Sequence, residues 1–297
     1  KKATGVKVID TETKEKLFFE SDIIFCCTSA IASNAILMQS KSERFPNGLG
    51  NDSGELGHNI MDHHLGVGAY ALVDEHQDDY YIGRKPGSIY IPRFRNLDEQ
   101  TKRSDYIRGY GYQGAASRRN WQRGVAEMSY GQSLKDDLVK PGPWMIGITG
   151  FGECLPYHDN KISLNHKKLD QWGLPTIDFD VEFKENEIAM RKDIKKEAVA
   201  MLKAAGHTKV MGFDDPKKFA PGLAIHEMGG ARMGKDPKTS ILNQYNQIHT
   251  VPNVYVTDGA CMTSSGCQNP SLTYMALTAR AANHAVEEFK KNNKAES

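Results

Sequence analysis

The stretch NVYVTDGACMTSSGCQNPSLTYMALTARAANHAVEEF, residues 253–289, decides how this chain folds. It opens with alternating apolar residues that predict a strand, continues through a loop of small residues, and ends in a pattern typical of a helix. Asn269 and Pro270 mark the start of that helix. Asn is a favoured N-cap, and Pro at the first helical position lacks only an N–H that would have no partner there.

The N-terminus of this helix has two interpretations. The simpler one is a capped helix, which these residues favour when taken by themselves. The other is that its N–H groups and positive dipole face a group that becomes negative during a reaction. Helical spacing places one apolar stripe on this helix, made of Leu272, Met275, Ala276, Ala279, Val286 and Phe289. We therefore expect the helix to pack through this stripe, with Met275 and Leu277 in the core rather than against a cofactor.

Composition excludes several classes of partner. The 297 residues could form one large domain or two ordinary ones. With 38 Lys and Arg against 37 Asp and Glu, the net charge is +1, which predicts no nucleic-acid or anionic-membrane binding. The apolar runs are all shorter than the roughly 18 residues that a membrane span needs, so none is expected. Five cysteines without a CxxC pair indicate mostly reduced thiols. The compartment, cytoplasmic or periplasmic, stays open.

Strand and helix patterns divide the chain into three segments, 1–64, 65–224 and 225–297. The first shows a hairpin (6–10 and 16–21), an apolar strand (22–27) and a helix (31–40). The second shows short aromatic and β-branched runs that predict one sizeable antiparallel sheet: 66–73, 87–94, 106–115, 144–153, 161–166 and 176–183. A long amphipathic helix over 185–206 follows, with Gly206 placed to end it. A β-rich insert thus separates two parts of an α/β domain.

Two local patterns contain residues suited to chemistry. In HEMGGARMG, residues 226–234, a zinc-protease helix is excluded because Gly230 stands where that motif needs a second His. The glycines there would instead let another molecule approach the backbone near His226. Asp258 and Gly259 follow the strand at 254–257, where a carboxylate suits a hydroxyl-rich cofactor tail. A plain Asp-Gly turn is the alternative.

Two further patterns are tempting and are interpreted as structural. GHNIMDHH, residues 57–64, gathers three histidines around Asp62, but neighbouring side chains point apart, so we expect a structural cluster and no metal site. Gly48, Gly50 and Gly54 are spaced one residue too long for a dinucleotide fingerprint, and no strand precedes them.

Taken together, these motifs resemble the glucose-methanol-choline (GMC) family of flavin oxidoreductases. Residues 226–234 and 253–289 carry most of the resemblance, and GLGNDSGELGHNIMDH at 48–63 is similar to the family's GLG…S…LGRNLMDH stretch. GECLPYHDNKISLNHKKLDQWGLP at 152–175 looks like the sugar-oxidising branch, which includes pyranose oxidases and glucoside dehydrogenases. The resemblance implies an α/β (α+β) fold: a partial FAD-binding Rossmann-like domain (1–64 and 225–297) with an inserted antiparallel-sheet substrate domain (65–224).

The resemblance also implies an activity, the FAD-dependent oxidation of an alcohol group on a sugar or glycoside. His226 would take the hydroxyl proton while hydride passes to flavin N5, and Asn269 would orient the substrate oxygen. An imidazole suits this role because its ordinary pKa lies near neutrality. Asp258, Gly259 and Ala260 would contact the ribityl and pyrophosphate groups. The helix start would point at the pyrimidine edge, where reduction leaves negative charge, through Pro270, Ser271, Leu272 and Thr273.

The sequence departs from the family's pattern in three places, one of which is that MQSKSERF at 38–45 lacks the family's Ser-Gly-x-Gly. Asn34 stands where the family's helix usually has Pro, and the N-terminal Gly-x-Gly-x-x-Gly turn that cradles the ADP half of FAD is missing. We therefore expect a C-terminal portion that needs the N-terminal half of the same protein, or a complementary chain. Two other functions stay open: a lyase of the hydroxynitrile type, and an inactive fragment that binds carbohydrate or a partner. Oxygen, a quinone and a cytochrome all remain candidate electron acceptors.

Overall fold

The computed structural model describes residues 2–76, 79, 88–118, 130–139, 142–216 and 220–295. The chain divides into two compact units, which are described separately. Unit one contains Lys1–His63, Cys154–Glu182 and Pro221–Ser297, and unit two contains His64–Glu153 and Phe183–Ala220. These divisions differ from the three segments expected from the sequence. The assignment of those segments to FAD and to substrate stays a prediction.

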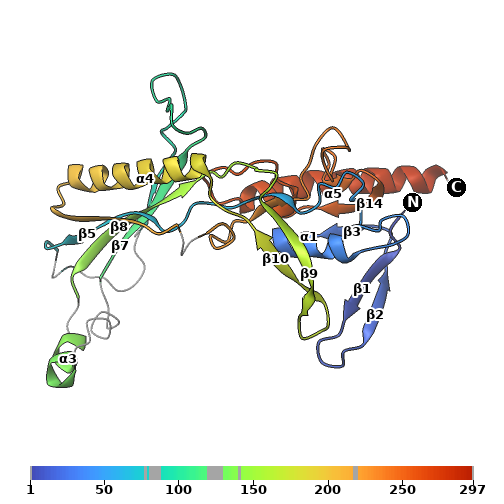
Figure 1. Cartoon of the computed structure of the whole chain (residues 1–297), viewed down its shortest axis with the longest axis horizontal. Coiled ribbons are helices and arrows are strands. Elements are labelled where there is room, and N and C mark those ends of the chain that lie inside the picture. The colour runs from blue at the N-terminus through green and yellow to red at the C-terminus, as the bar shows by residue number, and fades with distance from the viewer. Residues whose placement is uncertain are drawn as a thin grey trace. The chain divides into compact units, whose positions relative to one another are not determined.

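A three-stranded sheet in unit one joins segments from the first and last parts of the chain. Strand β3 (Ile24–Cys26) pairs in parallel with β14 (Val251–Val256), and β13 (Gln247–Ile248) pairs antiparallel with β14 on its other side. Helix α1 (Ala30–Gln39) follows β3 directly (Figure 1). This parallel pair places strands from the first and last parts of the sequence side by side in one sheet, as expected. Parallel strands need a long connection, and here the whole intervening chain supplies it.

Three antiparallel pairs complete the strands of unit one. The predicted hairpin is confirmed as β1 (Gly5–Ile9) and β2 (Lys16–Glu20), where Asp10 accepts the N–H groups of Glu12 and Thr13 in the turn. Strand β4 (His58–Met61) pairs with β12 (Met228–Gly230). Strand β9 (Lys161–Leu169) forms a hairpin with β10 (Pro175–Asp180). The β4–β12 pair brings the MDHH stretch beside the strand that follows His226.

Unit two is built on a five-stranded antiparallel sheet of order β11-β5-β8-β7-β6. Its strands are β5 (Val67–Val73), β6 (Ser88–Ile91), β7 (Tyr110–Arg118), β8 (Trp144–Gly152) and β11 (Lys209–Asp214). The long predicted helix is confirmed as α4 (Glu185–Ala204), and Gly206 follows it with φ +96°. Met190, Ile194 and Ala198 of α4 are fully buried in one cluster with Val67 and Ala69 of β5. A short helix, α3 (Gly131–Leu138), also belongs to this unit.

A buried carboxylate ties α4 to the strands of unit two. Asp193 accepts the hydroxyls of Tyr106 and Tyr110, each at 2.7 Å, and the Nε of Arg95 at 2.9 Å. Burial would raise the pKa of Asp193, but the tyrosine hydroxyls and the guanidinium outweigh it and lower this pKa. Three hydrogen-bond donors therefore stabilise the negative charge of Asp193 in this core.

The predicted antiparallel sheet is partly wrong. Its first four strands lie in one sheet as expected, but β9 and β10 form their own hairpin in unit one, and β11 from beyond α4 takes an edge of the sheet. Period-two patterns predict strands but not their neighbours, which explains the error. Gly87, with which the second of these predicted strands began, lies outside the described residues.

The final helix, α5 (Ser271–Ala295), begins where Asn-Pro predicted, but its expected core stripe is wrong. Leu272 is 77% exposed and Met275 67%, and Ala276, Ala279, Val286 and Phe289 are exposed as well. The side that packs within unit one carries the fully buried Ala281 and the partly buried Leu277. Ala281 and Ala285 pack against Tyr255 of β14, whereas the bulky apolar side chains of the expected stripe are exposed.

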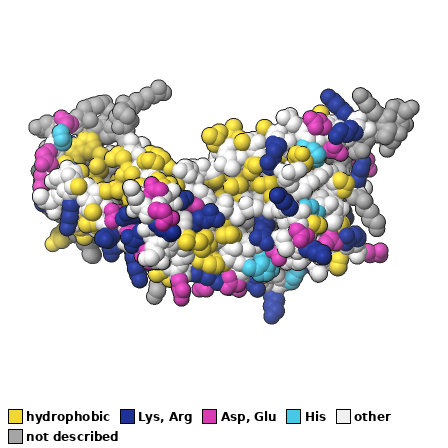
Figure 2. All heavy atoms as spheres, turned by 90° about the horizontal axis from the view of Figure 1, so that it is seen from above, with side chains coloured by type: hydrophobic (Ala, Val, Ile, Leu, Met, Phe, Trp, Pro, Cys, Tyr) yellow, Lys and Arg dark blue, Asp and Glu magenta, His cyan; other side chains and the backbone are white. Residues whose placement is uncertain are grey.

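The surface agrees with the near-neutral composition. Lysine, arginine, aspartate and glutamate side chains are interspersed over the face drawn in Figure 2, and neither sign dominates it. Within the described ranges, none of the helices combines the length and apolar character required to cross a bilayer.

Candidate active site

Two side chains that the sequence placed 43 positions apart meet in unit one. The Nδ2 of Asn269 lies 3.2 Å from the Nε2 of His226. His226 is half-buried in the segment that leads into β12, whereas Asn269 is exposed at the end of the loop before α5. The structure thus brings together the two residues predicted to act on substrate. Their catalytic roles remain a proposal.

The other ring nitrogen of His226 contacts a second histidine. The Nδ1 of His226 lies 2.8 Å from the Nδ1 of His63, and the two rings meet edge to face at 4.8 Å between centroids. The Nε2 of His63 is hydrogen-bonded to the backbone oxygen of Gly266, in the loop that carries Asn269. His63 is only 1% exposed, and burial lowers its pKa to about 4. It is therefore neutral at physiological pH.

A buried carboxylate holds the backbone on which His226 stands. Oδ2 of Asp62 accepts the N–H groups of Gly222 at 2.7 Å and Ala224 at 2.9 Å. Its Oδ1 accepts the N–H groups of His63 at 2.7 Å and His226 at 3.2 Å. Burial raises the pKa of Asp62, and these four hydrogen bonds oppose the rise. The Asp62 side chain therefore holds the backbone from Gly222 to His226 in place.

The residue that this carboxylate brackets is strained. Ile225 has φ +57°, a left-handed conformation that β-branched residues rarely adopt, and its side chain is 82% exposed. Its two neighbours, Ala224 and His226, both donate their N–H groups to Asp62. Such strain persists only where the surroundings over-determine it, and Asp62 supplies that constraint.

The glycines after His226 serve packing inside the chain. A Cβ on Gly229 would lie 2.1 Å from the backbone oxygen of Asn59, and one on Gly230 would lie 2.1 Å from Nδ2 of Asn34. The buried Asn34 also donates to the backbone oxygens of Ala30 at 2.8 Å and Gly229 at 3.0 Å. The two glycines therefore allow the close approach of α1 and β4 of the same unit. Asn34, the departure from the family's usual Pro, joins α1 to β12.

The predicted contacts at the end of β14 are largely used within the chain. Asp258 accepts the N–H of Ala260 at 2.9 Å and the hydroxyl of Ser33. Burial raises the pKa of Asp258, against these hydrogen bonds. Gly259 and Ala260 are buried in the short helix η1 (Gly259–Cys261), and the oxygen of Ala260 accepts from Ala231. The turn interpretation is therefore satisfied, and a cofactor contact by these three residues stays a prediction.

The start of α5 presents a different set of groups. Ser271, Leu272 and Thr273 are exposed, whereas Pro270 is buried and its oxygen accepts the N–H of Tyr274. The first N–H groups of a helix have no partner within it and carry partial positive charge. Because Asn269 precedes this helix end, the donors lie beside the His226–Asn269 pair. This donor set fits the edge of a flavin that gains negative charge on reduction.

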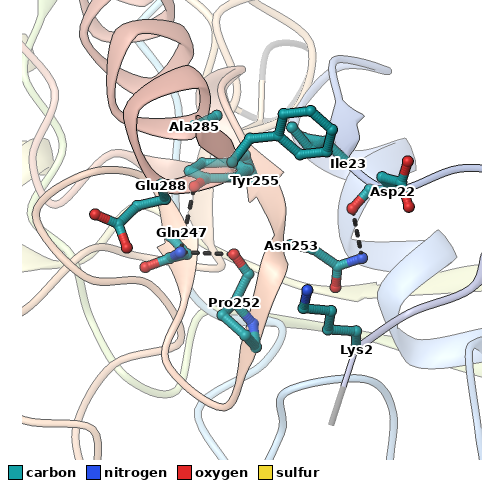
Figure 3. A pocket seen from close by; sticks show the side chains of 10 residues that line it. Lys2, Asp22, Ile23, Gln247, Pro252, Asn253, Tyr255, Ala285 and Glu288 are labelled. Carbon is teal, nitrogen blue, oxygen red and sulfur yellow. Dashed lines mark hydrogen bonds between the residues drawn. The ribbon is translucent and has the colours of Figure 1, made fainter. Parts of the chain in front are cut away.

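Sequence reasoning missed Asp62 and His63. The cluster GHNIMDHH was interpreted as structural, and its consecutive side chains do diverge: His63 contacts His226, while the ring of His64 lies against Phe183. The available signal was a carboxylate and imidazole pair next to a Gly-rich turn, in the stretch that matches the family's MDH. A separate pocket, drawn in Figure 3, is lined by Asn253, Tyr255 and Gln247 among others and contains none of the site residues.

Comparison with known proteins identifies part of the chain. Residues 156–278 match the family model described as GMC oxidoreductase. This part of the chain is similar to the C-terminal domain of GMC oxidoreductases. The matched range contains both His226 and Asn269, whereas Asp62 and His63 lie outside it.

Curated relatives match the chain over half of its length or more. The 2-methyl-1,2-propanediol dehydrogenase of Mycolicibacterium austroafricanum is 29% identical over 97% of this chain and 52% of its own length. The fructose dehydrogenase large subunit of Gluconobacter japonicus is 27% identical over 96% of this chain and 53% of its own. The C-glycoside 3-oxidase of Arthrobacter globiformis is 28% identical over 52% of this chain. The chain spans about half the length of the first two relatives.

Solved structures show the same fold. A crystal structure of pyridoxine 4-oxidase from "Mesorbium loti" superposes with a TM-score of 0.59 at 14% identity, covering 96% of this chain and 55% of that one. A formate oxidase structure superposes with a TM-score of 0.58 at 14% identity, covering 98% of this chain. The fold of this chain is thus shared with these two structures over part of their length.

Proposed function

We propose that this chain forms the substrate-side half of an FAD-dependent oxidoreductase that oxidises an alcohol group on a sugar or glycoside, with His226 as the base. The contact between Nε2 of His226 and Nδ2 of Asn269 carries the proposal. An alcohol needs an acceptor for its O–H proton and a donor to its oxygen, and these two atoms offer both at one point. The names of the relatives, a diol dehydrogenase, a fructose dehydrogenase and a C-glycoside oxidase, support a hydroxyl-rich substrate.

The side chains have separate tasks in this reaction. The substrate hydroxyl would lie between the two groups, donating to Nε2 of His226 and accepting from the amide of Asn269. His226 keeps the proton, and the alcohol carbon loses hydride, which leaves a carbonyl compound as product. When bound, FAD accepts that hydride. The N–H groups at the start of α5, from Ser271 to Thr273, would stabilise the negative charge left by the transfer.

Completion of the FAD site requires more protein than the described residues provide. The relatives are about twice as long as their matched part, and the exposed apolar side of α5 in unit one, including Leu272 and Met275, suits a covering segment. We propose that the N-terminal half of the same protein, or a complementary chain, covers this side and holds the ADP half of FAD.

Substitution of His226 tests the proposal in protein that contains bound flavin. The His226→Ala variant should lower kcat for sugar oxidation by about 10²- to 10⁴-fold while flavin absorbance and unfolding midpoint stay near wild type. The exposed His166→Ala, on β9, is the matched control and should leave kcat unchanged. Anaerobic bleaching of flavin by sugars, compared with a simple diol, assigns the substrate class. Normal turnover by His226→Ala would refute the role of this base.

A further inference from the structure

A chain of hydrogen bonds runs through the candidate site and fixes where its protons sit. The backbone oxygen of Gly266 can only accept, so Nε2 of His63 carries a hydrogen and donates to it. A neutral imidazole has one N–H, so Nδ1 of His63 has a lone pair. The contact of 2.8 Å between the two Nδ1 atoms is then a hydrogen bond from His226 to His63. The amide of Asn269 accordingly donates to Nε2 of His226.

We infer that His63 is a positioning residue, which holds His226 in the tautomer with its hydrogen on Nδ1 and its lone pair on Nε2. Asp62 helps to keep the two histidines together, because its Oδ1 accepts the backbone N–H groups of both His63 and His226. The inference rests on the proposed function of His226 as base.

The arrangement matters because only one tautomer can take the substrate proton. An imidazole with hydrogen on Nε2 presents a donor toward Asn269 and the substrate, and it cannot act there as a base. The nitrogen that carries the proton is set by the hydrogen bond that the other nitrogen makes. After proton uptake both nitrogens of His226 carry hydrogen, and Nδ1–H still donates to His63. The same contact therefore serves both states of the base.

The groups that face His63 give it a stable neutral form. Burial is the main cause of its lowered pKa, the proximity of His226 acts in the same direction, and the Gly266 carbonyl acts against them. Were His63 charged, its Nδ1 would also donate, and His226 would be driven to the unproductive tautomer. A buried imidazole thus acts as an acceptor that does not change with pH over the physiological range.

Nitrogen-15 NMR of the full chain labelled at histidine tests the inference without turnover. Two-bond couplings to the ring protons distinguish the tautomers, and His226→Gln and His63→Asn variants assign the two rings. The expected result is hydrogen on Nδ1 of His226 and on Nε2 of His63 at neutral pH. Hydrogen on Nδ1 of His63, with hydrogen still on Nδ1 of His226, would overturn the inference and leave the proposed function standing. Hydrogen on Nε2 of His226 would overturn the inference and also remove the acceptor that the proposed base needs.

Two substitutions separate positioning from simple packing. In His63→Asn the carboxamide oxygen can replace Nδ1 as the acceptor, so the Nδ1–H tautomer of His226 and most of kcat should be retained. In His63→Leu the acceptor is lost, so the tautomer population should shift and kcat should fall about tenfold with little change in KM. Equal losses in the two variants, with unchanged tautomers, would show a packing role only. Correct tautomers together with an active His226→Ala enzyme would instead refute the proposed function.

Discussion

Asp62 and His226 are joined through the backbone although 164 positions separate them: Oδ1 of the carboxylate accepts the N–H of His226 at 3.2 Å. Because the same carboxylate also binds Gly222, Ala224 and His63, it uses both oxygens on four donors. The backbone position of His226, the base of the proposed reaction, therefore depends on a carboxylate at position 62. Asn cannot replace Asp62, because its NH₂ group cannot accept hydrogen bonds.

The Asp62→Asn substitution should destabilise unit one by roughly 3 kcal/mol, since either amide orientation turns an NH₂ group toward two backbone donors. The matched control is Asp10→Asn in the β1–β2 turn, where a single oxygen accepts from Glu12 and Thr13 and an amide oxygen can do the same. Urea unfolding of both variants measures the difference. A near-neutral Asp62→Asn would contradict the four-donor geometry.

Gly230→Ala should be strongly destabilising, and removal of the side chain it meets should relieve it in part. The added Cβ would lie 2.1 Å from Nδ2 of Asn34, so Gly230→Ala and Asn34→Ala should couple by about 1 kcal/mol or more in a double-mutant cycle. The residual cost reflects the φ of +92° at Gly230. Gly229→Ala offers the comparison, because its Cβ would meet the backbone oxygen of Asn59, which Asn59→Ala cannot remove.

His63 should make the unfolding free energy depend on pH. Its pKa is about 4 in the folded chain against an ordinary value of 6.5, so below pH 6.5 the unfolded chain binds a proton that the folded chain does not. Stability is therefore complete above 6.5 and falls by roughly 3 kcal/mol as pH drops to 4.

His63→Asn serves as the reference for this titration, because the other groups around the site, Asp62, His226 and Glu227, are common to both proteins. Urea unfolding across this pH range should show a shallower loss of stability in the variant than in the wild type. Parallel curves would mean that His63 titrates alike in the folded and unfolded chains.

Surface and core of α5 should respond to substitution in opposite ways. Met275 is 67% exposed, so Met275→Ser should change the unfolding free energy of this chain by less than about 0.5 kcal/mol. Ala281 is fully buried against Tyr255, so Ala281→Leu should cost about 1–3 kcal/mol by overpacking. A large loss of stability in Met275→Ser would show that Met275 is buried after all, as the apolar stripe in the sequence predicted.

The site divides between what local sequence could show and what it could not. His226, Asn269 and the helix start at Pro270 stood in motifs with a specific order and could be named without coordinates. Asp62 and His63 could not be given roles, because their partners lie in β12's approach loop and in the loop before α5. Those contacts depend on β4 pairing with β12, and periodicity does not encode which strands pair.

By itself, the sequence determined the elements: the β1–β2 hairpin, helices α1, α4 and α5, the strand before Asp258, and the GMC resemblance with its His and Asn. Turn residues, caps and hydrophobic periods act over a few neighbouring positions, so they are visible in one dimension. Only the tertiary structure decided that β9 and β10 leave the large sheet, that the apolar stripe of α5 lies outside, and that His63 meets His226. Each depends on contacts between distant segments, whose free energy comes from burial and hydrogen bonding that no single segment contains.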